Sequence, residues 1–190
     1  MDVETAAKAP VRRALGFRTV FNTLGPLCNP ACVKRQLIGV PSVEILGLIG
    51  EVLAALDTER ALVVHTPGPY DEVALTGVTR AVLVTRGETQ LLEIAPRDLG
   101  LSPVAPVVLA GGAPEENARR IVDAFTGEDK ALANVICANA GCALFAAGAA
   151  RNPYEGFAEA RKALAGGRAL EKLDALRAFS RSGRHDDVAD

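Results

Sequence analysis

Four side chains capable of chemistry stand close together shortly after a short apolar run. The run is ALVV, Ala61 to Val64, and His65, Tyr70, Asp71 and Glu72 follow it. In open α/β sheets, ligands collect beyond the carboxyl ends of strands, so the segment TPGPYDE is a candidate binding loop. Adjacent carboxylates supply the hard oxygen ligands that Mg²⁺ takes from proteins, often with substrate phosphates completing its coordination. The alternatives are a solvated Asp-Glu turn and a His65 that packs and bonds to backbone instead of acting as an acid, a base or a ligand.

A second group of candidates lies near the N-terminus. Arg12, Arg13 and Arg18 precede the stretch FNTLGPLCNP, residues 21–30, whose Pro, Gly and Asn content predicts a rigid loop. Arginine binds carboxylates through a planar two-point fork. Helical spacing separates Arg12 from Arg13 by about 100°, so one of them at most is expected to face a given pocket. Solvation at the surface is the alternative for each.

The spacing of the cysteines does not favour a metal site. Cys28, Cys32, Cys137 and Cys142 do not form two close CxxC pairs, which favours reduced, packed thiols over a zinc site or a disulfide framework.

The secondary structure that must position these residues is predicted to mix strands with a helix in the first half of the chain and to be helical in the second half. Strand patterns at 36–40 and 61–64 flank a helix that begins after Ser42, and two β-rich segments around Gly87, 79–86 and 89–94, predict a hairpin. Helical patterns follow at 114–126, 130–149, 153–165 and 168–180, and another covers 3–16. We therefore expect an α/β fold with a mixed, mainly parallel sheet flanked by helices. Residues 1–180 are expected to form one α/β domain portion, and 181–190 a polar tail.

Composition narrows the class of partner. The chain has 190 residues and a formal net charge of −2, with no large basic field for nucleic acid or an anionic membrane. No uninterrupted apolar run reaches the roughly 18 residues of a membrane span, and the N-terminus lacks a secretory pattern. These features predict a soluble, cytoplasmic protein that binds small molecules.

Three segments together carry a family resemblance. PVRRALGFRTVFNTLGPLCNPA (residues 10–31) closely resembles the signature segment of anthranilate phosphoribosyltransferases, members of the nucleoside phosphorylase-like glycosyltransferases. RALVVHTPGPYDE (residues 60–72) looks like the strand and metal loop of that family, and LAGGAPEENA with ANAGCALFAAGAA is similar to its later helical region. The resemblance runs in the family's order from about Pro10 to Leu176.

The resemblance implies a reaction and a role for five residues. Arg12 would hold the carboxylate of anthranilate, Gly25 and Pro26 would line the aromatic pocket, and Asp71 and Glu72 would bind Mg²⁺ on the pyrophosphate of phosphoribosyl pyrophosphate (PRPP). The family reaction joins the anthranilate amine to ribose C1, giving N-(5-phosphoribosyl)anthranilate and pyrophosphate for tryptophan biosynthesis. Positioning and charge stabilisation suffice for this transfer, so no catalytic side chain is assigned.

The sequence also departs from the family. A small helical domain, a glycine-rich PRPP loop and a Lys-His-Gly-Asn segment are absent, and Val3 to Ala6 stand where a His-Pro-Ala-Met-Lys stretch is usual. We expect a C-terminal portion of the enzyme, from a split or a truncated gene, that is inactive or nearly inactive alone. A separate N-terminal half is one candidate partner, and the family's homodimer contacts lie in the absent helical domain, which leaves a homodimer of this chain open. The alternatives are a noncatalytic binding or assembly module of the same fold, and a family member with another aromatic or nucleobase substrate.

Overall fold

The computed structural model describes residues 27, 29, 31–56 and 58–182. Contacts divide the chain into two units, Met1–Val33 and Lys34–Asp190. In the first unit, the described residues form a turn in which Asn29 accepts hydrogen bonds from two backbone N–H groups, Ala31 to its side chain and Cys32 to its carbonyl, each at 3.0 Å. The second unit contains the elements that position the loop after Ala61–Val64.

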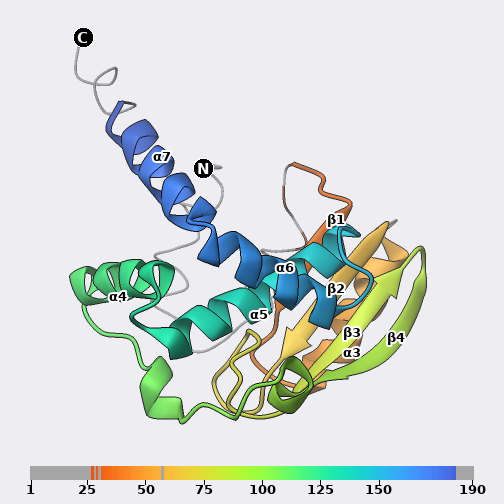
Figure 1. The fold of residues 1–190 in the computed structure, drawn as a ribbon. Helices are drawn as coiled ribbons and strands as arrows, with labels where there is room; N and C mark the ends of the chain where they lie inside the picture. Colours follow the sequence, from red (N-terminus) through yellow and green to blue (C-terminus); the bar gives the residue numbers. More distant parts are fainter. Residues whose placement is uncertain (1–26, 28, 30, 57, 183–190) are drawn as a thin grey trace, which may run out of the picture. The chain divides into compact units, whose positions relative to one another are not determined.

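A four-stranded sheet forms the centre of the second unit (Figure 1). Its strands lie in the order β1 (Arg35–Gly39), β2 (Arg60–His65), β3 (Thr79–Thr85) and β4 (Glu88–Ile94). The β1–β2 pairing is parallel, whereas β2–β3 and β3–β4 are antiparallel. The α/β class and the mixed sheet are confirmed. The expected predominance of parallel pairing is wrong for the described strands, because the β3–β4 hairpin contributes antiparallel neighbours on one side of β2.

The strands differ in burial as their sequences predict. β2 is buried along almost its whole length, since its continuous apolar run is covered on both faces. β4 is an edge strand, and Leu91 on it is 80% exposed. The two-residue connection Arg86–Gly87 has positive φ at both positions, +48° and +89°, the backbone of the hairpin turn that matches strand twist.

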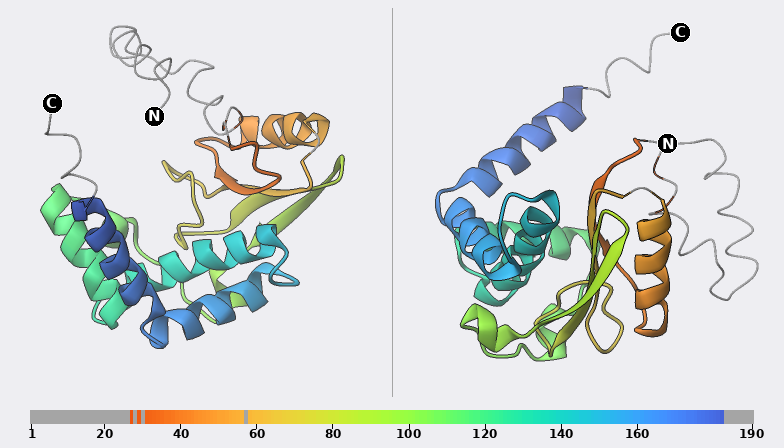
Figure 2. Two further views of the ribbon diagram at one scale, coloured as in Figure 1. Left: turned by 90° about the horizontal axis from the view of Figure 1, so that it is seen from above. Right: turned by 90° about the vertical axis from the view of Figure 1, so that its right-hand side faces the viewer.

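Helices cover both faces of the sheet (Figure 2). α3 (Glu44–Ala55) lies on one face and contacts β2, β3 and β4, with Leu46, Ile49 and Leu53 buried. The predicted cap at Ser42 is displaced by one residue, because the residue before the helix is Val43 and its side chain makes no capping bond. The Ser42 hydroxyl instead bonds the Glu44 carboxylate, which lowers the pKa of Glu44.

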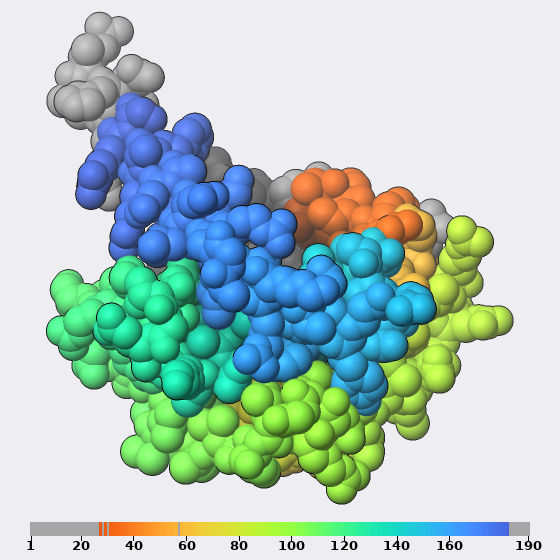
Figure 3. Space-filling model, viewed as in Figure 1, coloured from red at the N-terminus to blue at the C-terminus, as the bar shows by residue number. Residues whose placement is uncertain are grey.

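The opposite face is covered by α5 (Lys130–Ala147), on which α6 (Pro153–Ala165) packs. The two helices meet at glycines: a Cβ on Gly141 would lie 2.4 Å from the backbone nitrogen of Phe157, and one on Gly156 would lie 2.2 Å from the Gly141 carbonyl oxygen. Cys137 and Cys142 are buried free thiols on α5, and burial raises the pKa of Cys142 to about 12. Figure 3 shows α6 on the outside of this layer.

Helix α5 also carries the one sequence window among the described residues that is long and apolar enough to cross a membrane. The sequence predicted a long, alanine-rich helix here, and Lys130, Asn134 and Asn139 interrupt its apolar residues. Nearly half of the window is buried against the rest of the fold, as in the core helix of a globular domain.

The remaining helices pack with α5 and α6, on the side of the sheet opposite α3. Two short 3₁₀ helices, η2 (Pro96–Leu99) and η3 (Pro106–Leu109), lead to α4 (Pro114–Thr126), which ends at the left-handed Gly127 as predicted. The last helix, α7 (Arg168–Ser182), contacts α6 and α4, and none of its residues is buried. It continues two residues past its predicted end at 180; the proposed domain and tail boundaries stay predictions.

Candidate functional site

The candidate loop, residues 66–78, leaves the carboxyl end of β2 and returns to the start of β3. Its first part is closed by a bridge in which the Thr66 N–H donates to the Tyr70 carbonyl at 3.2 Å. Gly68, with φ +107°, provides the left-handed backbone of this tight turn. The predicted placement of the loop at the carboxyl end of a central strand is therefore confirmed.

A buried pair of threonines holds the loop from inside. The Thr66 hydroxyl donates to the Glu72 carbonyl at 2.6 Å and lies 2.7 Å from the Thr79 hydroxyl and 3.2 Å from the Ala74 N–H. Because a hydroxyl has one proton, Thr66 accepts the hydrogen bonds of both Thr79 and Ala74. Both threonines are fully buried, so water does not compete for these hydrogen bonds. The network therefore fixes the backbone from Glu72 to Ala74.

Asn139 of α5 holds the next residue of the loop. Its Oδ1 accepts a hydrogen bond from the Val73 N–H at 3.0 Å, and its Nδ2 donates to the Val73 carbonyl at 3.0 Å and to the Val135 carbonyl at 2.9 Å. The amide therefore satisfies both polar backbone groups of a residue 66 positions away in sequence. Val73 itself is fully buried, so these groups have little access to water.

Gly39, the last residue of β1, allows the backbone of the loop to approach the strand closely. A Cβ at this position would lie 1.5 Å from the backbone oxygen of Asp71, so any other residue would displace the loop. Beyond Val73 the chain is also constrained: Leu75 is buried with φ +60°, and its carbonyl accepts the Val104 N–H at 2.9 Å. Such strained positions persist where the surroundings over-determine the backbone.

The two carboxylates project from this fixed backbone into solvent. Asp71 and Glu72 are exposed, and neither makes an ion pair with another described residue. Partial desolvation, and then the neighbouring Asp71 carboxylate, raise the pKa of Glu72. Uncompensated negative charge on adjacent oxygen ligands fits the requirements of Mg²⁺, which is often bound by one or two carboxylates and completes its coordination with water or substrate phosphates. Within the described part of the chain, no group of three or more metal-ligating side chains occurs, so a cation here would need such additional ligands.

His65 has the structural role that the sequence left open as its alternative: it packs and bonds to the backbone. It is buried at the end of β2, and its Nδ1 lies 3.0 Å from the Val40 carbonyl, to which it donates. The ring thereby joins the ends of the two parallel strands that support the loop.

The structure describes only part of the predicted site, and the roles of Asp71 and Glu72 in metal binding stay predictions. Arg12, Gly25 and Pro26, together with Arg13 and Arg18, lie outside the described residues, so their roles stay predictions. Sequence reasoning missed three positioning residues: Thr66, Asn139 and Gly39. An asparagine within an apolar helix was the one visible signal, since such a residue needs a buried partner.

Comparison with known proteins defines the class first. The model of a glycosyl transferase family, a/b domain, matches residues 3–170, and the chain therefore belongs to this family.

The particular relatives agree with the resemblance seen in the sequence. Anthranilate phosphoribosyltransferase from Shewanella amazonensis is 45% identical over 176 residues, which are 92% of this chain and 51% of the relative. The structure of the anthranilate phosphoribosyltransferase from Thermus thermophilus superposes with a TM-score of 0.81 at 41% identity, covering 91% of this chain and 51% of that one. The Saccharomyces cerevisiae enzyme in complex with PRPP and Mg has a TM-score of 0.75 at 25% identity, covering 88% and 48%. The chain thus spans about half the length of the relatives that it matches.

Proposed function

We propose that the chain is the C-terminal portion of an anthranilate phosphoribosyltransferase. In this proposal it contributes to the transfer of the phosphoribosyl group from PRPP to anthranilate, giving N-(5-phosphoribosyl)anthranilate and pyrophosphate. The observation that carries the proposal is the loop after β2, where Asp71 and Glu72 are exposed on a backbone held by Thr66 and Asn139. The family match over residues 3–170 includes that loop, and the relatives named for this reaction cover most of the chain.

In the proposed site, Asp71 and Glu72 bind Mg²⁺ carried by PRPP. When bound, the ion would offset negative charge on the departing pyrophosphate. The yeast relative in complex with PRPP and Mg supports this role. Partial desolvation and then the charge of Asp71 raise the pKa of Glu72, and a bound cation would offset the second of these effects. The chain's own contribution is positional, because hydrogen bonds to Glu72, Val73 and Ala74 fix where the carboxylates stand.

The residues proposed to bind the acceptor belong to the sequence of the first unit. Arg12 would hold the anthranilate carboxylate in its two-point fork, while Gly25 and Pro26 would form a rigid wall for the ring. The yeast relative has also been crystallised with 4-fluoroanthranilate, an analogue of the proposed acceptor. We propose that the glycine-rich PRPP loop belongs to the half of the relatives that this chain does not match, and that the protein works in the cytoplasm.

Complementation tests this function directly. The chain alone, with PRPP, anthranilate and Mg²⁺, is expected to release no pyrophosphate above background. Addition of a polypeptide carrying the N-terminal half of the Shewanella relative should restore release, and Arg12→Gln should abolish the gain. Full activity of the chain alone would contradict the proposed division of the site, and no activity with any partner half would favour the noncatalytic module.

A local measurement tests the metal loop independently of turnover. Mn²⁺, which accepts similar oxygen ligands and broadens nearby NMR signals, should broaden the amide signals of Glu72, Val73 and Ala74 first. The double variant Asp71→Asn/Glu72→Gln should remove this effect, while Glu51→Gln, an exposed substitution on α3, should leave it unchanged. Equal broadening in all three proteins would rule out the loop as a metal site.

A further inference from the structure

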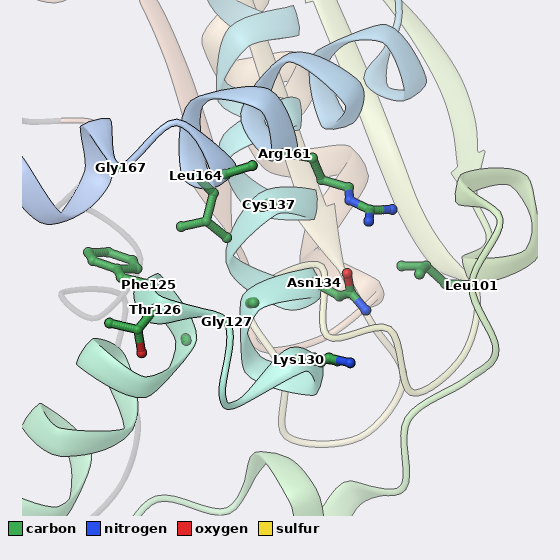
Figure 4. A pocket seen from close by; sticks show the side chains of 13 residues that line it. Leu101, Phe125, Thr126, Gly127, Lys130, Asn134, Cys137, Arg161, Leu164 and Gly167 are labelled. Carbon is green, nitrogen blue, oxygen red and sulfur yellow. The ribbon is translucent and has the colours of Figure 1, made fainter.

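A separate pocket lies in the helical layer, away from the candidate metal loop. It has a volume of about 430 Å³, is open to solvent, and is lined by the end of α4, the first half of α5, the end of α6 with Gly167, and Leu101 (Figure 4). This volume falls in the range of small-molecule sites. The proposed transfer reaction makes no use of it.

Helix α5 separates the pocket from the metal loop. Lys130, Asn134 and Cys137 line the pocket and follow the i, i+4, i+7 spacing of one helical face. Asn139 bonds the loop residue Val73 and donates to the Val135 carbonyl. At about 100° per residue, Val135 and Asn139 lie on the opposite side of the helix from the pocket. The two sites therefore share a helix but no lining residue.

The pocket carries positive charge without a matching acid. None of its lining residues is acidic, and Lys130 and Arg161 form no ion pair with any other described residue. The carboxylate next to Lys130 in sequence, Asp129, is already engaged: it pairs with Arg120 at 3.1 Å and caps α5 through the Leu132 N–H. Arg161 lies over the Phe157 ring at 5.8 Å, a contact that leaves its N–H groups free for a ligand.

The polar groups gather on one side of the pocket and the apolar ones on the other. Figure 4 shows the ends of Arg161, Asn134 and Lys130 directed toward the side where Leu101 lies, with Phe125 and Leu164 on the far side. A ligand that fits both parts has one anionic end and an apolar body. We propose that this pocket binds a small organic monocarboxylate, with Arg161 and Lys130 at the carboxylate and the apolar wall around the rest.

The probe for this pocket is 4-fluorobenzoate, followed by ¹⁹F NMR and by amide shifts of the ¹⁵N-labelled full chain. Saturable binding should shift the amides of Gly127, Asn134 and Ala165, which line the pocket. The neutral amide 4-fluorobenzamide, with the same ring and no charge, should bind at least fivefold more weakly. Equal binding of both probes would overturn the anionic part of the proposal.

Variants locate the site. Arg161→Gln and Lys130→Gln should each raise the Kd about fivefold, the effect of one partly exposed charge contact, and both together at least tenfold. Arg119→Gln, a substitution on the exposed surface of α4, is the matched control and should leave the Kd unchanged. Ala165→Phe should block the pocket without changing its charge. Binding that survives Arg161→Gln and Ala165→Phe but is lost in Arg12→Gln would place the probe in the proposed anthranilate site and refute this pocket as its site.

Discussion

Two asparagines in this protein make the same pair of hydrogen bonds in different surroundings. Asn139 Oδ1 and Nδ2 bond the N–H and the carbonyl of Val73, each at 3.0 Å. Asn117 Oδ1 and Nδ2 bond the N–H and the carbonyl of Gly112, at 2.9 and 3.0 Å. Val73 is fully buried within the candidate loop. Gly112 is exposed and lies only five residues before Asn117 in the sequence.

The difference shows how burial, and not geometry, determines what a hydrogen bond contributes. Water can replace the Asn117 amide at the exposed Gly112, so the bonded and solvated states differ little in free energy. No water replaces Asn139 at Val73 without opening the loop, so loss of that amide leaves two buried polar groups unpaired. The loop that carries Asp71 and Glu72 is therefore fixed by a contact from a distant helix, although it has no regular secondary structure.

A pair of glycines offers the largest test of this contrast. In Gly39→Ala the new Cβ meets the Asp71 backbone oxygen, which cannot turn aside, and we expect a loss of about 3 kcal/mol in the free energy of unfolding. In Gly112→Ala the new Cβ meets the end of the Glu116 side chain at 2.1 Å, which can rotate into solvent, so the loss should stay below about 0.5 kcal/mol. Urea denaturation measures both. Equal losses would show that the candidate loop is displaced as easily as the exposed turn.

The asparagines themselves provide the next test. Asn139→Leu keeps the approximate volume but leaves Val73 without its partners, and should cost about 2.5 kcal/mol in the free energy of unfolding. Asn117→Leu removes the same two bonds at Gly112 and should cost less than about 1 kcal/mol. Amide hydrogen exchange should also increase at Val73 in the first variant. Unchanged exchange there would contradict the role assigned to Asn139.

The same contrast explains what the sequence could predict. The strands and the hairpin around Gly87 were accessible to prediction, because apolar runs and a turn glycine act within a few residues. The position of the carboxylate pair could also be predicted, because the pair shortly follows a buried strand. The contact of Asn139 was not, since its partner lies 66 positions away and only the fold brings them together. Gly39 was interpreted as an ordinary strand residue, because nothing near it in sequence indicates the approach of Asp71.

Thr66 tests the inner support of the loop with a smaller change. Thr66→Val has nearly the same shape but removes the hydroxyl that bonds the Glu72 carbonyl, Thr79 and the Ala74 N–H. We expect a loss of about 2 kcal/mol in the free energy of unfolding, and Thr79→Val in the same background should restore part of it by removing an unpaired buried hydroxyl. Thr126→Val is the control, because its hydroxyl bonds only exposed carbonyls at the end of α4. Additive losses for the two buried threonines would show that they do not act as one network.

The smallest expected effect concerns the charge that the fixed loop holds at its surface. The pKa of Glu72 is raised above its ordinary value by partial desolvation and by Asp71, so the folded state binds this proton more tightly than the unfolded chain does. Ionisation of Glu72 therefore costs stability: the favourable contribution is present below the unfolded pKa and is lost as the pH rises through the folded one. Glu72→Gln should raise the free energy of unfolding at pH 7 by about 0.5 kcal/mol, and the gain should vanish below about pH 4.

If the loop binds Mg²⁺, the ion should make the parent chain more stable than Glu72→Gln, the reverse of the order expected without it. Added Mg²⁺ is expected to stabilise the parent chain, because the cation binds the folded loop, while Glu72→Gln gains less. Thermal unfolding at pH 7, with and without the ion, measures both effects, and Glu51→Gln on α3 controls for general changes in charge. A gain for Glu72→Gln at pH 7 that persists at pH 3 would show that ionisation of the partly desolvated Glu72 beside Asp71 is not its cause. Equal stabilisation of the parent and Glu72→Gln by Mg²⁺ would show that the ion acts elsewhere, because an effect of this loop must depend on the carboxylate that Thr66 and Asn139 hold in place.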